Sequence, residues 1–228
     1  MLALILIIAM FAAVVWLPGW WVQQVLERHR RPANRYPGTG GELARHLLDR
    51  AGLDAVRVEQ SRDGDHYDPD ARCIRLRPEN YAERSLTAIT VAAHEVGHAI
   101  QHADGYGPLL WRTRLVKTAA RVQRIGAVLM LLMPLALIAL KVPRVGLVML
   151  AVGLAALASG VVIHLVTLPV ELDASFRRAL PILERGGYLK AEDRPAARRI
   201  LTAAALTYVA ASLAGLFNFM WWLRMLRP

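Results

Sequence analysis

The sequence predicts a mainly α-helical, polytopic membrane protein that also carries a small α+β region with a short β-hairpin. Hydrophobic residues make up 55% of the 228 residues, which is more apolar than an ordinary soluble domain. These residues gather in four long runs, which leave room for one modest globular unit. The single cysteine, Cys73, excludes an internal disulfide framework and a cysteine-rich metal site.

The first apolar run covers residues 2–21 and contains no charged residue. A helix of about 20 apolar residues can cross a hydrocarbon core of about 30 Å. We therefore expect residues 1–27 to form an N-terminal transmembrane anchor. A cleaved signal peptide is the alternative, but no basic residue precedes the run and no clear cleavage site follows it.

The other apolar runs lie in the second half of the chain. Residues 125–140 and 145–170 are separated by only four residues, so they predict a transmembrane hairpin over 125–170. The run 201–223 ends beside two tryptophans, which favour a membrane interface, and it predicts a membrane helix over 201–228.

The distribution of basic residues predicts the orientation of these spans. Of the 28 Lys and Arg residues, 17 lie within residues 28–124 and 7 within residues 177–199. The positive-inside rule places both stretches on the cytoplasmic face. Anionic lipid and membrane orientation account for the net charge of +10, so the expected partner is the lipid bilayer and no nucleic acid is expected.

Residues 28–124 form the predicted catalytic region. Residues 36–41 are rich in Pro and Gly and indicate a linker, which an amphipathic helix follows. Residues 55–60 and 73–77 alternate as strands do and predict a small hairpin or edge pair. Two roles for it remain open: holding an extended substrate by strand addition, or covering the helix that follows.

That helix, predicted over residues 86–103, carries the sequence His-Glu-x-x-His. His94 and His98 are four residues apart, so both imidazoles project from one face and can bind one ion. Glu95 can reach a water on that ion without binding the ion itself. Imidazoles suit Zn²⁺, which lowers the pKa of its water to about 7. The motif predicts a zinc hydrolase site with Glu95 as general base.

A catalytic zinc usually takes three protein ligands, so a third ligand is needed. His102 keeps the spacing but lies about 12 Å along the helix from the first histidine. Asp104 stands where metzincins place their third ligand, but Gln101 replaces the glycine at which that chain turns. Glu171 directly follows an apolar segment that would deliver its carboxylate beside the histidines. We expect Glu171, in a loop or helix over 171–200, to complete a His₂Glu site.

Five stretches carry recognisable motifs in order: residues 66–69, 74–76, 91–102, 167–175 and 203–211. Together they resemble the YugP-type membrane zinc metallopeptidases of bacteria. The resemblance runs in order from about residue 30 to about residue 215. It implies a zinc-dependent peptidase of the bacterial cytoplasmic membrane in which His94 and His98 bind zinc and Glu95 is the base. By similarity to gluzincins it also implies Glu171 as the third ligand.

The residues that support the ligands differ from the family pattern. Relatives often carry an aspartate four residues after the ligand glutamate, whereas here that position is Ser175 and the nearby acid is Asp173. Either side chain can take the supporting role. Further polar groups are candidates for the site or for an oxyanion donor, each with a packing or membrane-rim role as the alternative: His66, Tyr67, His164, Arg177, Arg178 and Tyr208.

Two functions therefore compete. The first is a membrane-bound metalloendopeptidase with one zinc per chain, acting in membrane-protein turnover. The second is a zinc-holding membrane scaffold without turnover. Glu95 distinguishes them, because hydrolysis needs it and zinc binding does not. No pattern in the sequence identifies the peptide substrate or an oligomeric state.

Overall fold

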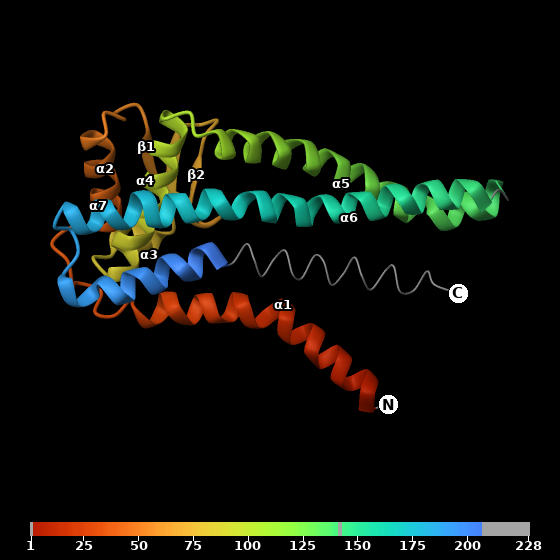
Figure 1. The fold of residues 1–228 in the computed structure, drawn as a ribbon, viewed down its shortest axis with the longest axis horizontal. Helices are drawn as coiled ribbons and strands as arrows, with labels where there is room; N and C mark the ends of the chain where they lie inside the picture. Colours follow the sequence, from red (N-terminus) through yellow and green to blue (C-terminus); the bar gives the residue numbers. More distant parts are fainter. Residues whose placement is uncertain (1, 141–142, 207–228) are drawn as a thin grey trace. The chain divides into compact units, whose positions relative to one another are not determined.

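The computed structural model describes residues 2–140 and 143–206 (Figure 1). The chain divides into two compact units. The site unit comprises Pro18–Leu110 and Leu168–Thr207, and the helical unit includes Trp111–Thr167 and the beginning of the chain.

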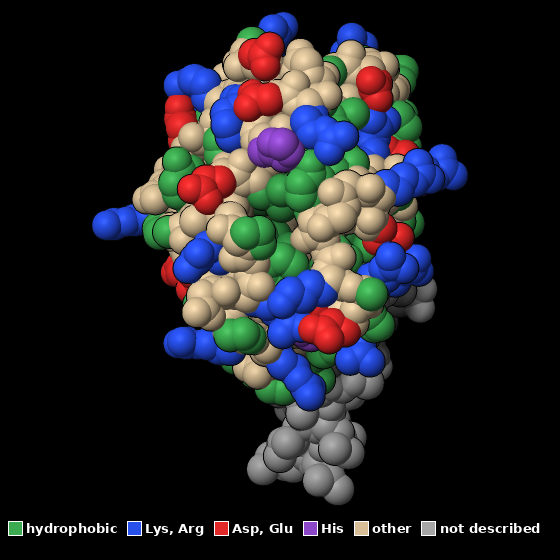
Figure 2. All heavy atoms as spheres, turned by 90° about the vertical axis from the view of Figure 1, so that its left-hand side faces the viewer, with side chains coloured by type: hydrophobic (Ala, Val, Ile, Leu, Met, Phe, Trp, Pro, Cys, Tyr) green, Lys and Arg blue, Asp and Glu red, His purple; other side chains and the backbone are tan. Residues whose placement is uncertain are grey.

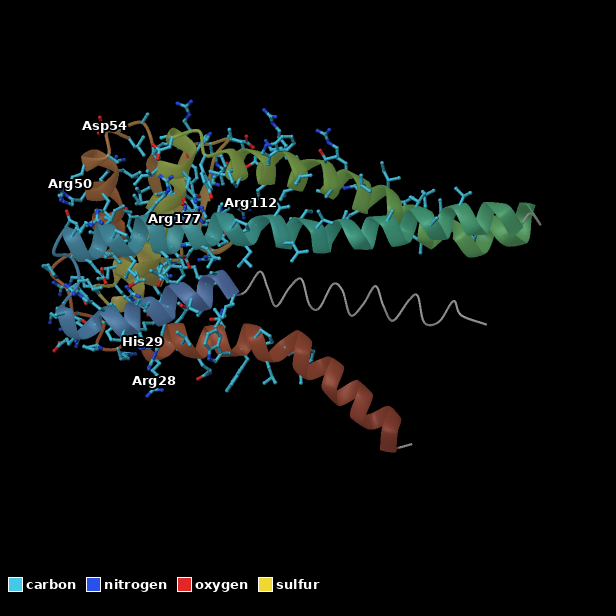
Figure 3. All side chains as sticks on the ribbon, viewed as in Figure 1. Arg28, His29, Arg50, Asp54, Arg112 and Arg177 are labelled. Carbon is cyan, nitrogen blue, oxygen red and sulfur yellow. The ribbon has the colours of Figure 1, made fainter. Side chains whose placement is uncertain are left out.

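Three long helices contribute to the helical unit: α1 (Leu2–Arg28), α5 (Gly107–Leu140) and α6 (Pro143–Leu172). Within it α5 and α6 lie side by side, and the amide of Gln123 donates to the hydroxyl of Ser159 over 3.5 Å (Figure 1). The C-terminal end of α1 belongs to the site unit, and Figure 3 shows the side chains of Arg28 and His29 there.

In the described part of the chain, no helix combines the length and the apolar character that a membrane span requires. The prediction of a polytopic membrane protein is therefore wrong. In α5, for example, only the residues after Arg124 form an uncharged run, and that run is shorter than the roughly 20 residues a span needs. The predicted multi-pass topology and cytoplasmic face rested on such spans and have no support in the described residues. Most of the predicted membrane helix over 201–228 lies outside the described residues.

The mainly helical character and the small sheet are as predicted, and helix α4 (Leu86–Ala103) is the centre of the site unit. The hydroxyl of Ser85 accepts a hydrogen bond from the backbone N–H of Ala88 and so caps the start of α4. Almost every residue of α4 is buried, because other elements of the site unit pack around it. The fully buried large side chains of this core include Leu48, Ile74, Leu76, Val96, Leu183, Ile200 and Leu201.

Two short helices pack beside α4. Helix α2 (Gly40–Arg50) begins with a capping box, in which Thr39 and Glu42 each accept a hydrogen bond from the other's backbone N–H. It buries Leu47 and Leu48 in the core. Helix α3 (Pro78–Ala82) connects the sheet to α4.

The sheet has three strands in the order β1-β3-β2: β1 (Arg57–Gln60), β3 (Cys73–Leu76) and β2 (His66–Asp68). Strands occur within both predicted stretches, but β1 and β3 run parallel, so the prediction that they form a hairpin is wrong. The intervening β2 is the strand that pairs antiparallel with β3. Because β2 occupies an edge of the sheet, one side of its backbone is left for other contacts.

The chain beyond α6 packs against α4. A π-helical segment, η1 (Asp173–Ala179), leads into α7 (Leu180–Arg185), and a 3₁₀ turn, η2 (Ala191–Asp193), precedes a helix over 194–206. An ion pair joins this part to the start of the site unit.

In that ion pair the Arg35 guanidinium and the Tyr36 hydroxyl both donate to the carboxylate of Asp193, at 2.6 and 2.5 Å. This contact joins residues more than 150 positions apart in the sequence.

Candidate metal centre

Two histidines of α4 form one side of the candidate centre. His94 and His98 lie one turn apart, and their ring centroids are 4.7 Å from each other. Both side chains are buried, with 6% of each residue exposed. The helical spacing that the sequence predicted is therefore the spacing in the structure.

Glu171, in the last turn of α6, forms the other side of the centre. Its Oε2 atom lies 3.2 Å from His94 Nε2 and 3.3 Å from His98 Nε2. Burial would raise the pKa of this carboxyl, but the two facing imidazoles outweigh burial and lower it. The structure thus brings together all three residues that the sequence nominated as ligands, and their ligand atoms lie within 4.8 Å of one another.

A glycine permits this approach. A Cβ atom at Gly97 would lie 2.8 Å from the backbone oxygen of Ala174 in η1, which is closer than packed atoms tolerate. Gly97 stands between the two histidines, and Ala174 lies three residues after Glu171. The glycine inside the motif therefore allows the helix that carries the imidazoles to approach the segment that follows the carboxylate.

The ring orientation of His98 follows from its hydrogen-bond partners. The Gln101 amide nitrogen donates to the backbone oxygen of Val170 and to Asp173 Oδ2, at 2.9 and 2.8 Å. Both partners only accept, so Gln101 Oε1, 2.9 Å from His98 Nδ1, must be the acceptor of that bond. His98 therefore carries a proton on Nδ1, and in the neutral ring Nε2 is the nitrogen left to bind a metal ion.

The two side chains that could support the ligands contact different histidines. Ser175 Oγ lies 3.1 Å from His94 Nδ1. Asp173 accepts from Gln101 and also from Arg178 Nε at 2.8 Å, so it reaches His98 through the glutamine. Sequence reasoning nominated Ser175 and Asp173 but missed Gln101 as a bridge, although its position three residues after His98 places it on a neighbouring part of the same helix.

Glu95 lies beside the cluster and is also buried, with 5% exposed. Burial raises the pKa of its carboxyl to about 7, while the charge of neighbouring His94 acts in the opposite direction. A carboxyl with a pKa near neutrality can both take up and release a proton at physiological pH, as a general base and acid must.

The other nominated side chains lie outside the three-residue cluster. His102 shares a 2.8 Å hydrogen bond with the hydroxyl of Tyr67, and Asp104 accepts from Arg178 at 2.5 Å. His66 contacts the Gly64 carbonyl at 3.3 Å. Arg177 is exposed on η1. The side chain of His164 and the whole of Tyr208 fall outside the described residues.

The donor set fits zinc in type and spacing. Two imidazole nitrogens and one carboxylate oxygen are the ligands of many catalytic zinc sites. Ligand atoms about 2.1 Å from a tetrahedral ion are separated by about 3.4 Å. The observed separations of 3.2 and 3.3 Å from Glu171 to the two imidazoles match this value. One zinc ion can therefore be held by His94, His98 and Glu171.

Comparison with known proteins agrees with the chemistry of the site. The model of a family described as "Putative neutral zinc metallopeptidase" matches residues 4–227. The chain is 40% identical over 188 residues to "Putative membrane protease YugP" of Bacillus subtilis (strain 168), an alignment that covers 80% of this chain and 78% of that relative. No solved structure matches the chain. The resemblance to the YugP-type family is thereby confirmed, and the chain belongs to this family of zinc metallopeptidases.

Proposed function

We propose that this protein is a zinc-dependent endopeptidase in which His94, His98 and Glu171 bind one zinc ion and Glu95 is the general base. The observation that carries the proposal is the convergence of these four buried side chains from two distant parts of the sequence. A scaffold that only stored zinc would need the three ligands, but it would have no need of a buried carboxyl with a raised pKa beside them.

The residues of the chain divide the chemical work. Zinc, when bound, supplies Lewis-acid activation of water and of the peptide carbonyl. The Glu95 carboxylate takes a proton from the attacking water, whose oxygen forms a bond to the carbonyl carbon. Glu95 then passes the proton to the leaving nitrogen as the C–N bond breaks. Gln101 and Ser175 keep the ligand rings oriented during these steps.

Strand β2 supports a binding mode for the substrate. It is an edge strand of the sheet. The hydroxyl of Tyr67, on this strand, bonds to His102 of α4. An extended peptide that paired with β2 would be held by backbone hydrogen bonds, which do not depend on its side chains. This arrangement suits an endopeptidase of broad sequence tolerance.

We also propose that the enzyme works in association with a membrane. The relative in Bacillus subtilis is named a membrane protease, and α1 exposes Trp16, Trp20 and Trp21 to between 40% and 76%. Indole rings favour the interface between lipid and water. Membrane proteins undergoing turnover are the substrates that such a location would favour.

The first test is the variant Glu95→Gln, which preserves size and removes the base. We expect purified wild type to carry about one zinc per chain by elemental analysis and to cleave an unfolded protein such as casein. The variant should keep its zinc and lose cleavage by at least about a hundredfold. Glu184→Gln on α7 is the matched control and should behave as wild type. If Glu95→Gln cleaved as fast as wild type, Glu95 would not be the general base. If wild type bound zinc but cleaved no protein, the alternative of a zinc-holding scaffold would be favoured.

A second variant tests the third ligand. Glu171→Ala should lose most of its zinc, because two imidazoles alone bind the ion weakly. A Glu171→Ala protein that holds as much zinc as wild type would move the third ligand elsewhere.

A further inference from the structure

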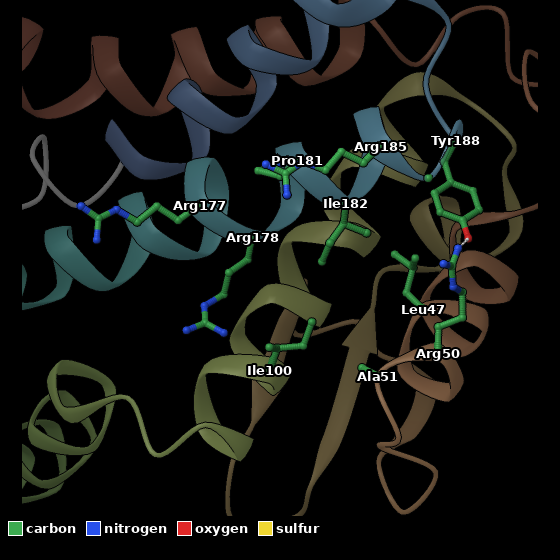
Figure 4. Close-up of a pocket in the computed structure, with 11 residues that line it drawn as sticks. Leu47, Arg50, Ala51, Ile100, Arg177, Arg178, Pro181, Ile182, Arg185 and Tyr188 are labelled. Atoms are coloured by element: carbon green, nitrogen blue, oxygen red, sulfur yellow. Dashed lines mark hydrogen bonds between the residues drawn. The ribbon is translucent and has the colours of Figure 1, made fainter.

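A groove outside the metal centre combines arginines with an apolar floor. Its volume is about 450 Å³, which is the size of a site for one or two side chains or a small ligand. Figure 4 shows its walls, which come from the ends of α2 and α4 and from η1, α7 and the turn after α7. The apolar lining includes Leu47, Ala51, Ile100, Pro181 and Ile182.

All the charged residues that line this groove are basic: Arg50, Arg177, Arg178 and Arg185. Arg178 is held by Asp173 and Asp104. Within the part of the chain that the structure describes, the other three form no salt bridge, and Arg50 donates only to the neutral hydroxyl of Tyr188 at 2.8 Å. Three guanidinium groups are therefore available to a ligand.

The surrounding face shows the same combination. Figure 2 looks onto the end of the site unit that carries α2 and α7, where Lys and Arg side chains, with Asp and Glu side chains among them, lie around patches of apolar ones. A glycine pair, Gly186 and Gly187, forms the turn after α7, and Gly187 adopts a φ of +71°. This turn positions Tyr188, whose hydroxyl is also 2.7 Å from His46 Nε2. The tyrosine wall of the groove is thus held by two residues on one face of α2, His46 and Arg50.

The groove is separate from the metal-binding face of α4. Ile100 follows His98 by two positions, which is about 200° around a helix, so the two side chains project to nearly opposite sides. A ligand on Ile100 therefore leaves the space between the imidazoles and Glu171 open.

These features determine the chemistry of the ligand. Guanidinium groups bind carboxylates in a planar, two-bond geometry. The apolar floor between them requires hydrophobic groups interspersed with the carboxylates. A recessed site of this size receives protruding side chains, whereas a bilayer surface or a nucleic-acid backbone would need a raised or open basic surface.

The geometry points to a docking site for an acidic, partly apolar segment of a polypeptide. Under the function proposed above, and resting on it, this segment is a part of the substrate remote from the bond that is cut. Docking there would raise the local concentration of the substrate at the metal centre without contacting the zinc ligands.

The test is a direct binding measurement on full-length Glu95→Gln protein, which does not consume the peptide. The probe is a fluorescein-labelled twelve-residue peptide that alternates leucine with aspartate or glutamate, and its control has asparagine and glutamine at the acidic positions. We expect the acidic peptide to bind about tenfold more tightly or better, and its affinity to fall as salt is raised. Equal binding of the two peptides would overturn the proposal.

A pair of double variants locates the site. Arg50→Ala with Arg185→Ala removes two guanidinium groups from the groove and should weaken the acidic peptide about tenfold. Arg62→Ala with Arg194→Ala removes the same charge from exposed positions outside the groove and should leave the affinity unchanged. If both pairs weaken binding equally, the attraction comes from the net charge and the proposal fails.

Two further outcomes separate this proposal from others. If the groove pair loses binding to vesicles of phosphatidylglycerol while peptide binding is unaltered, the groove recognises lipid and the peptide proposal is overturned. In wild type, adding the acidic segment to a cleavable neutral peptide should lower KM and leave kcat unchanged. If wild type binds the acidic peptide but cleaves no substrate, the docking site stands and the proposed peptidase activity is refuted. If wild type cleaves substrates but does not bind the acidic peptide, the peptidase activity stands and the docking site is refuted.

Discussion

The ring of His98 is oriented by a side chain whose own hydrogen bonds are complete. Gln101 is fully buried, and its amide group contacts His98, Val170 and Asp173. Asp173 is in turn bonded by Arg178, which lowers the pKa of its carboxyl against the opposing effect of burial. A chain of hydrogen bonds therefore runs from η1 to His98, a proposed zinc ligand, and it keeps a proton on Nδ1 of the imidazole.

Replacing Gln101 tests this arrangement. Gln101→Leu has a similar volume but cannot accept from His98 Nδ1, and it leaves the Val170 carbonyl without its side-chain donor. We expect zinc affinity to fall about 10- to 100-fold, measured by competition with a coloured zinc chelator. Gln60→Leu, at an exposed position on β1, should bind zinc as wild type does. Equal affinities in the two variants would show that Gln101 is only a packing residue.

At this scale the sequence predicted what one helix determines. His94, Glu95 and His98 share α4, so their relative placement follows from helical spacing alone. Glu171 could be nominated from its position after an apolar segment, but its distance from the imidazoles depends on how α6 packs. Arg178 and Asp173 lie on the same segment, η1. Their connection to His98 through Gln101 could not be predicted from the sequence, because it depends on how η1 packs against α4.

Among the elements, the contact of α4 with η1 positions the proposed ligands, and Gly97 lies at a close approach in that contact. In Gly97→Ala the new methyl group would meet the Ala174 oxygen at 2.8 Å, so η1 has to move. Such overpacking typically costs about 1–3 kcal/mol in the free energy of unfolding, and here it should also weaken zinc binding. Thermal unfolding and a zinc titration measure the two effects.

The matched control is Gly19→Ala. Nothing lies within 4 Å of a Cβ atom at Gly19 in α1, so this change should be neutral or stabilise the protein by up to about 1 kcal/mol. If Gly97→Ala were as stable as Gly19→Ala, the close approach would not constrain the site.

The elements also show where sequence patterns stop being informative. Periodicity located strands near residues 57 and 73, yet it does not reveal whether two strands pair directly or in which direction, and the parallel pairing was missed. The apolar runs predicted the long helices α1, α5 and α6, but a run counted along the sequence is not a membrane span. Leu131 and Leu135 of α5 and Val148 of α6 are exposed, so an apolar run does not by itself show what covers a helix.

At the scale of the whole molecule, the Asp193 cluster ties the start of the site unit to its last helix. The Arg35 and Tyr36 donors outweigh the effect of burial and lower the pKa of the Asp193 carboxyl. A carboxyl with a lowered pKa stabilises the fold above its unfolded pKa, and this stabilisation is lost as the pH falls toward the folded value.

Asp193→Asn should therefore lower the free energy of unfolding at pH 7 by about 2 kcal/mol, because two hydrogen bonds to a charge are weakened. As the pH falls below about 4 the difference in free energy of unfolding should begin to shrink, and it should vanish only below the lowered pKa of the folded-state carboxyl, where wild type has lost the same charge. Chemical denaturation at a series of pH values measures both. Asp54→Asn, at an exposed loop position, is the control. A stability difference that stays constant down to pH 3 would exclude the charge as its source.

Zinc itself should stabilise the whole site unit, because its proposed ligands come from α4 and from the end of α6, and His94 and Glu171 are 77 residues apart. A ligand that binds only the folded state adds about 2.7 kcal/mol at a hundred times its Kd. Zinc should therefore raise Tm in wild type, and EDTA should remove the increase. Glu95→Gln should show the full increase because Glu95 is not among the proposed ligands. Glu171→Ala should show little increase, and its Tm in EDTA reports whether the apo fold is intact. If zinc raised the Tm of Glu171→Ala as much as that of wild type, the stabilising ion would bind elsewhere. The centre of His94, His98 and Glu171 would then not be the site through which zinc joins these two parts of the chain.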